Sequence, residues 1–116
     1  MKFLLDTNFL LIPAQFKVDI FSQLEGFGSP ELFTLDLVVK ELGRLDSRAS
    51  RLALALLKRH RVAVLRAQGK GTDAALLRRA KRGFTLCTQD RALAARARER
   101  GIPVVALRQK KYLSMR

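Results

Sequence analysis

The chain has 116 residues, of which 48% are hydrophobic, a size and composition that suit one domain with one packed core. Lys and Arg total 23 against 10 acidic residues, so the formal net charge is +13 and nucleic acid is the default partner. No apolar run approaches the roughly 18 residues of a membrane span, Asp6 interrupts the first apolar run too early for a signal peptide, and the lone Cys87 argues against disulfides and a cysteine zinc site. We expect a cytoplasmic protein without a membrane partner.

Short apolar runs alternate with helical patterns along the first half of the chain. Residues 2–5 are predicted to form a buried strand, residues 18–24 a helix, and residues 32–35 a second strand. Residues 38–45 and 48–59 are predicted to form two successive helices, because their leucines and alanines repeat at helical spacing.

The same alternation continues through the second half. Residues 62–65, 84–87 and 104–107 are predicted to be strands, and residues 73–81 and 90–100 helices. Continuous apolar strands separated by helices predict a parallel sheet covered on both faces. With right-handed crossovers, the fold class is a three-layer α/β/α sandwich whose central parallel sheet has four to five strands.

Four of the ten acidic residues follow predicted strands, where each strand gives way to a helix. They are Asp6, Glu41, Asp73 and Asp90. Because sites in such sheets form beyond the carboxyl ends of the strands, we expect these carboxylates to meet at one edge. Their mutual repulsion calls for a divalent cation, and oxygen ligands suit Mg²⁺ or Mn²⁺, as one or two ions.

Each acid taken singly also has a purely structural interpretation. Asp6 caps a helix as readily as it binds a metal, and Glu41 suits a solvated helix face. The carboxylates of Asp73 and Asp90 fall in first helical turns, where they favour the helix dipole, with Thr72 and Thr88 as candidate N-caps. The joint placement of all four, in a chain so poor in acids, favours a metal site.

The sequence resembles the PIN-domain nucleases over essentially its whole length. The matching segments are residues 4–8, 39–42, 72–76, 87–90 and 101–104, each short but in the expected order and spacing. The resemblance implies a PIN domain over residues 1–108 followed by a basic C-terminal tail, residues 109–116. It implies that Asp6, Glu41, Asp73 and Asp90 are both the metal ligands and the catalytic residues.

The resemblance further implies a metal-dependent endoribonuclease that hydrolyses phosphodiester bonds and leaves a 5′-phosphate. Asp6 and Asp90 are the expected direct ligands, Asp73 completes the first metal site, and Glu41 binds a metal or positions the attacking water. Thr7, Asn8 and Thr88 are expected to hold the carboxylates in place. Asp73 is followed by two alanines where similar sequences often have a second acid, so no neighbouring carboxylate substitutes for it.

Two branches of the family compete. Residues 6–16 and 107–113 resemble archaeal relatives of the small-subunit processome nuclease, which implies processing of ribosomal precursor RNA. The alternative is a VapC-type toxin ribonuclease with an antitoxin partner. A homodimer is plausible in either case, because related domains often pair. Outside catalysis, the alternatives are a non-catalytic RNA-binding module of a ribosome-assembly complex and a structural ribosomal or DNA-packaging protein.

Cations outnumber acids along the predicted C-terminal helices and the tail, and we expect them to contact RNA phosphates, with Tyr112 stacking on a base. His60, the only histidine, ends a basic helix and is predicted to be a surface residue without a catalytic part. The residues predicted to bind RNA are Lys40, Arg44, Arg78, Arg79, Lys81, Arg82, Arg91, Arg96, Arg108, Lys110, Lys111 and Tyr112.

Overall fold

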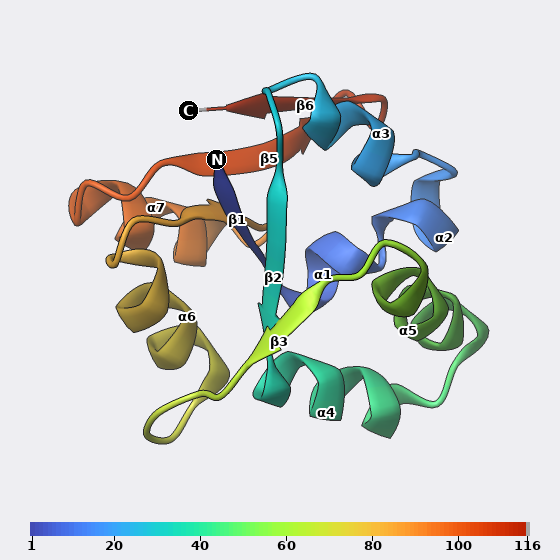
Figure 1. Ribbon diagram of the computed structural model, residues 1–116, viewed down its shortest axis with the longest axis horizontal. Helices are drawn as coiled ribbons and strands as arrows, with labels where there is room; N and C mark the ends of the chain where they lie inside the picture. The colour runs from blue at the N-terminus through green and yellow to red at the C-terminus, as the bar shows by residue number, and fades with distance from the viewer. Residues whose placement is uncertain (116) are drawn as a thin grey trace.

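The computed structural model describes residues 1–115, and they form a single twisted sheet with helices on both faces (Figure 1). The strands run in the order β3-β2-β1-β4-β5-β6; β1 to β5 are parallel, and β6 is antiparallel to β5. The elements in chain order are β1 (Lys2–Leu5), α1 (Thr7–Leu10), α2 (Ile12–Phe16), α3 (Ile20–Glu25), β2 (Glu31–Leu35), α4 (Asp36–Leu45), α5 (Arg48–Arg59), β3 (Ala63–Leu65), α6 (Thr72–Ala80), β4 (Thr85–Cys87), α7 (Arg91–Glu99), β5 (Val104–Arg108) and β6 (Tyr112–Met115).

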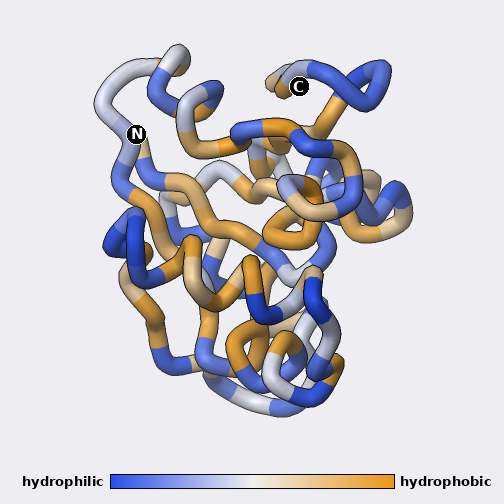
Figure 2. Tube along the Cα trace, turned by 90° about the vertical axis from the view of Figure 1, so that its right-hand side faces the viewer, coloured by the Kyte–Doolittle hydropathy of each residue, from blue (hydrophilic) through white to orange (hydrophobic). Residues whose placement is uncertain are grey.

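The predicted three-layer sandwich is confirmed. Figure 1 shows α6 and α7 on one side of the strands and α2, α3 and α5 on the other. The central strands are buried on both faces, as their unbroken apolar sequences predict; Phe3, Leu4 and Leu5 are completely buried. Figure 2 shows hydrophobic segments running through the interior and hydrophilic ones at the turns. Within residues 1–115, no helix has the length and apolar character to cross a membrane.

The order of the strands reverses at β1. From β1 the chain adds β2 and β3 on one side, and then crosses to add β4 and β5 on the other. The carboxyl ends of β1 and β4 therefore form the topological switch point, where ligand sites of open α/β sheets are found. The Asp6 amide extends this pairing by donating to the Cys87 carbonyl at 3.2 Å, so the chain leaves β1 and β4 close together.

The sheet has six strands rather than four or five. Much of the predicted basic tail belongs to it, because β6 pairs with β5 through four residue pairs and buries Leu113. Gln23 of α3 fixes the hairpin: its side-chain amide donates to the Lys111 carbonyl at 2.9 Å, and its Oε1 accepts from the Leu113 amide at 2.7 Å. Cations and a polar turn obscure this short strand in the sequence. Arg116, the last residue of the predicted tail, lies outside the described residues.

Other differences are local. Residues 7–16 show no clear periodicity, yet they form α1 and α2, two helices of one turn or little more, with Pro13 in the first turn of α2. The helix predicted from residue 18 begins at Ile20, because the Asp19 carboxylate accepts the Ser22 amide at 3.1 Å and caps α3. Strand β3 is the edge of the sheet, so Val64 is 52% exposed rather than covered.

Candidate metal-binding active site

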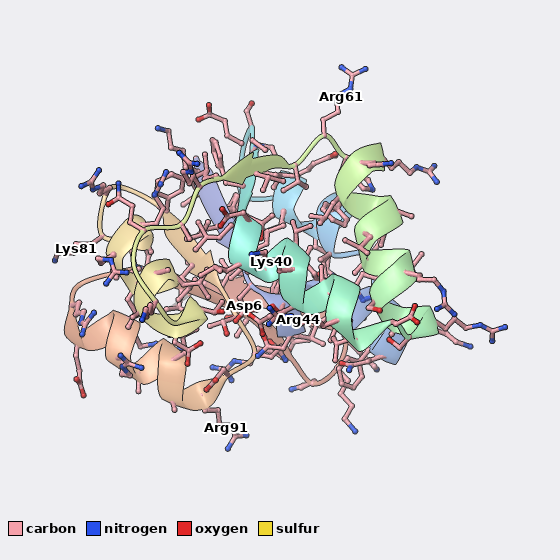
Figure 3. The ribbon with its side chains drawn as sticks, turned by 90° about the horizontal axis from the view of Figure 1, so that it is seen from below. Asp6, Lys40, Arg44, Arg61, Lys81 and Arg91 are labelled. Carbon is pink, nitrogen blue, oxygen red and sulfur yellow. The ribbon has the colours of Figure 1, made fainter. Side chains whose placement is uncertain are left out.

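A cleft of 460 Å³ opens at the carboxyl ends of β1 and β4, bordered by α1, α4 and α6. All four acids singled out in the sequence line it, together with Thr7, Asn8 and Arg44. In Figure 3, Asp6 lies near the centre of the molecule beneath α4, with Lys40 and Arg44 on that helix beside it. The four acids are far apart in the sequence, but the fold brings them around one opening.

Asp6 is the most buried of these acids, with 3% of its surface exposed. It leaves β1 directly after Leu5 and caps α1, where its Oδ1 accepts the Phe9 amide at 2.9 Å. The pKa of this carboxyl is raised from 3.8 to about 7, mainly by burial; the charges of Asp90 and Asp73 contribute to the rise, and hydrogen bonds from the Thr88 side chain and the Phe9 amide oppose it. A carboxylate buried beside other carboxylates is the arrangement that a bound cation stabilises.

Asp90 reaches the same cleft from β4. It is the N-cap of α7, and its Oδ1 accepts the Leu93 amide at 3.1 Å, so the expectation that Thr88 caps this helix is wrong. The Thr88 hydroxyl accepts the Asp90 amide at 3.0 Å, which fixes the loop one step earlier. Asn8 joins the two strand ends, because its Oδ1 accepts the Gln89 amide at 2.9 Å and lies 3.5 Å from the Thr88 hydroxyl.

Glu41 and Thr7 each carry a buried oxygen without a partner. The Glu41 Oε1 and the Thr7 Oγ1 make no hydrogen bond within the described chain, although both residues line the cleft. An unpaired buried polar atom costs on the order of 1–3 kcal/mol. A divalent cation with its water molecules would satisfy both atoms, so these residues fit a hard, oxygen-preferring ion such as Mg²⁺ or Mn²⁺.

Asp73 is the exposed member of the set, on the second residue of α6. Gly71, and not Thr72, is the N-cap of this helix. The loop before it is held from two sides: the Asp36 Oδ1 accepts the Ala67 amide at 3.0 Å, and Arg79 donates to the Arg66 carbonyl at 2.8 Å. Arg78 likewise donates to the Gln68 carbonyl. The sequence does not predict this role of Asp36. The only signal that could have indicated it is its position at the start of α4.

The acids surround the cleft without forming a closed ligand cage. Within residues 1–115, no group of three or more His, Cys, Asp or Glu side chains is close enough to hold a metal ion in this arrangement. His60 is not among the residues that line the cleft; its ring stacks on Phe21 with centroids 3.9 Å apart.

The residues predicted to bind RNA are spread over several surfaces. Arg44 alone among them lines the acidic cleft, while Arg78, Arg79 and Arg82 surround a small cavity of 80 Å³ beside α6. Arg91 and Arg108 line a further cleft of 410 Å³, which also holds Arg98, another cation of the predicted C-terminal helix. The remaining predicted cations and Tyr112 are exposed: Lys40, Lys81, Arg96, Lys110, Lys111 and Tyr112.

The fold and the cleft together define a three-layer α/β protein with a carboxylate-lined site at its topological switch point. Comparison with known families matches residues 3–110 to the PIN like domain, and this chain belongs to that family.

Two similar proteins agree with this assignment. Ribonuclease VapC9 of Archaeoglobus fulgidus is 33% identical over 114 residues, covering 91% of this chain and 82% of that protein. A solved structure, that of the PIN domain endonuclease Utp24, superposes with a TM-score of 0.86 at 26% identity, over 98% of this chain and 90% of the other.

Proposed function

We propose that this protein is a Mg²⁺- or Mn²⁺-dependent endoribonuclease. The observation that carries the proposal is the buried Asp6 carboxylate, which shares one cleft with three further acids, one of which, Glu41, has an unpaired buried oxygen. The family, and two similar proteins named as a ribonuclease and an endonuclease, support a nuclease with this site.

Each acid has a part that follows from its surroundings. Asp6 and Asp90 are the direct metal ligands, because helix caps fix their carboxylates at the two central strand ends. Asp73 completes the site from α6, and Glu41 holds the cation or positions the attacking water. Asn8 and Thr88 hold the ligand-bearing loops in place through hydrogen bonds, and the Thr7 hydroxyl, unpaired within the described chain, would bind the cation or one of its water molecules. A divalent cation bound there would lower the pKa of a bound water molecule and stabilise negative charge on the phosphate and the leaving oxygen.

The test is cleavage of a fluorescent single-stranded RNA in Mn²⁺ by Asp6→Asn and Asp90→Asn. Both variants are expected to lose cleavage and keep RNA binding, since asparagine still accepts the capping hydrogen bond. Asp19→Asn is a matched control, because Asp19 also caps a helix and lies outside the cleft. Full activity of either site variant would refute the proposal, and loss of binding together with cleavage would indicate misfolding.

We further propose ribosomal precursor RNA as the substrate. The support is the resemblance of residues 6–16 and 107–113 to processome relatives, together with the net charge of +13. The second candidate is a toxin ribonuclease with an antitoxin partner, which the likeness to VapC9 favours. Expression with and without the Asp90→Asn change separates them: growth arrest that needs Asp90 indicates the toxin, whereas ribosomal precursor cross-linked to the inactive variant indicates RNA processing.

A further inference from the structure

A second cleft lies directly beside the acidic one. It has a volume of 410 Å³ and is formed by the β4–α7 loop, α7, β5 and β6. Asp90 is the one residue that lines both clefts, so the two openings meet at a proposed metal ligand. An RNA chain that is cut beside Asp90 would continue into this second cleft on the α7 side.

Three arginines line the second cleft, two from α7 and one from β5. Arg91 begins α7, Arg98 lies two turns further along that helix, and Arg108 ends β5. Within residues 1–115 the single ion pair is Arg51 with Asp46, so none of these three guanidinium groups is in an ion pair, and Asp90 is the one carboxylate that lines the cleft with them. Arginines without ion-pair partners around a concave surface attract an anion, and a planar guanidinium group can donate two parallel hydrogen bonds to a phosphate.

The position of this cleft relative to the acids is fixed by Gln89. Its Oε1 accepts the Leu107 amide at 2.6 Å, which ties the β4–α7 loop to β5. Its own amide donates to Asn8 beside the acidic cleft at 2.9 Å. One residue therefore sets the spacing between the arginines and the proposed metal ligands, as a site that holds two parts of one substrate requires.

We propose that the cleft lined by Arg91, Arg98 and Arg108 binds the RNA backbone next to the scissile phosphate. The proposal rests on the proposed nuclease function. The volume falls in the range of pockets that hold a small organic ligand, enough for a nucleotide. The small side chains of Ala94 and Ala106 leave room between the arginines for the sugar. The shared residue Asp90 favours the substrate over an acidic protein segment as the occupant.

The first test measures binding of 5′-labelled oligouridylates, from a dinucleotide to an octanucleotide, in EDTA, where no cleavage occurs. Arg98→Gln and Arg108→Gln are each expected to weaken octanucleotide binding about tenfold, with little change for the dinucleotide. The double variant should reduce the salt dependence by roughly 1.4 in slope, the value for two phosphate contacts on a single strand. Thermal melts establish that the variants fold.

The matched control is Arg61→Gln, because Arg61 projects from the opposite side of the molecule from Arg91 (Figure 3). If Arg61→Gln weakens binding as much as Arg98→Gln, general charge explains the effect and the proposal is overturned. An oligoglutamate peptide of matched charge is the second control. Displacement of the octanucleotide by this peptide at equal concentration would mark the cleft as a docking site for acidic protein and would also overturn the proposal.

The second test places a photo-crosslinker in the cleft. Cys87 is fully buried, so a thiol reagent will select an introduced cysteine. Ser114→Cys lies in the arginine cleft, and Ser29→Cys lies before β2, at the other end of the central strands. Crosslinks to RNA are expected from residue 114 and not from residue 29; the reverse result contradicts the proposal.

The two proposals fail in different ways. If the wild-type protein binds RNA and Ser114→Cys crosslinks to it as expected, but neither cleaves RNA in Mn²⁺, the nuclease function fails and the cleft remains an RNA site. If cleavage is normal while Arg98→Gln and Arg108→Gln behave like Arg61→Gln, the function stands and the cleft proposal fails. In a cleaving protein, the nucleotide crosslinked from residue 114 should lie next to the cleavage point.

Discussion

The two halves of the acidic cleft are built differently. Asp6 and Asp90 sit at adjacent strand ends, and each accepts a backbone amide of the helix that it caps. Glu41 and Asp73 lie on helices across the opening, the first with an unpaired buried oxygen and the second exposed at the end of a long loop. The fold therefore fixes the first half in advance, whereas the second half would be drawn inward by the cation of the proposed function.

The largest expected effect follows from removing a ligand of the fixed half. Asp6→Asn and Asp90→Asn should each lower the rate of RNA cleavage by roughly 10²–10³, the usual cost of losing one preorganised electrostatic group. Steady-state cleavage in Mn²⁺ measures this loss. An effect smaller than that of Asp73→Asn would show that the helix-borne half, and not the strand-borne half, holds the metal more directly.

In the fixed half, burial of the Asp6 carboxylate should also destabilise the folded protein when no metal is bound. The folded-state pKa of Asp6 is about 7 against an ordinary value of 3.8, so folding disfavours the ionised carboxylate. The contribution of Asp6 to the free energy of unfolding is therefore most favourable below about pH 4, and it is lost as the pH rises through 7. Without metal at pH 8, Asp6→Asn should raise the melting temperature by about 5 °C or more.

Thermal melts with and without Mg²⁺ check this expectation. Mg²⁺ should raise the melting temperature of the wild-type protein and have little effect on Asp6→Asn, because the variant lacks the buried charge that the cation offsets. Asp19→Asn, a cap far from the cleft, should change neither value. Equal stabilisation of the wild-type protein and Asp6→Asn by Mg²⁺ would contradict the assignment of Asp6 as a ligand.

Changes in the second half should cost less. Glu41→Gln and Asp73→Asn are expected to lower cleavage by roughly 10–100-fold, a range typical of groups that support a metal site. The metal concentration needed for half-maximal rate should rise in both. If either variant instead matches Asp90→Asn, that residue belongs with the fixed half.

The sequence predicts the fixed half of the site better than the rest. Asp6 directly follows a buried apolar strand and Asp90 comes three residues after the end of another, so strand periodicity and the parallel-sheet rule place them together without knowledge of side-chain contacts. The excess of cations predicts that Arg98 contacts RNA, but not the cleft that it shares with Arg108 and Ser114, because that cleft depends on the pairing of β5 with β6. The strand β6 itself escapes prediction, since four residues beside a cluster of cations carry too weak a pattern.

Asn8 links the two strand ends of the fixed half. Asn8→Ala removes the acceptor for the Gln89 amide, a single hydrogen bond worth on the order of 1 kcal/mol, and should slow cleavage about tenfold. The stability loss should be the same with and without RNA. Asn8→Asp keeps an acceptor and should recover most of the stability, while an equal loss in both variants would mean that the hydrogen bond contributes little.

The smallest effect is expected in the loop that carries Asp73. Asp36→Ala frees the Ala67 amide, lets the loop before α6 move, and should slow cleavage by about three- to fivefold, a coupling below about 1 kcal/mol. Asp36→Asn retains the acceptor and should be close to wild type. Because Asp36 acts through Asp73, its replacement should have no further effect in an Asp73→Asn background. Additive losses in that double variant would show that the loop contributes to cleavage by a route other than positioning Asp73.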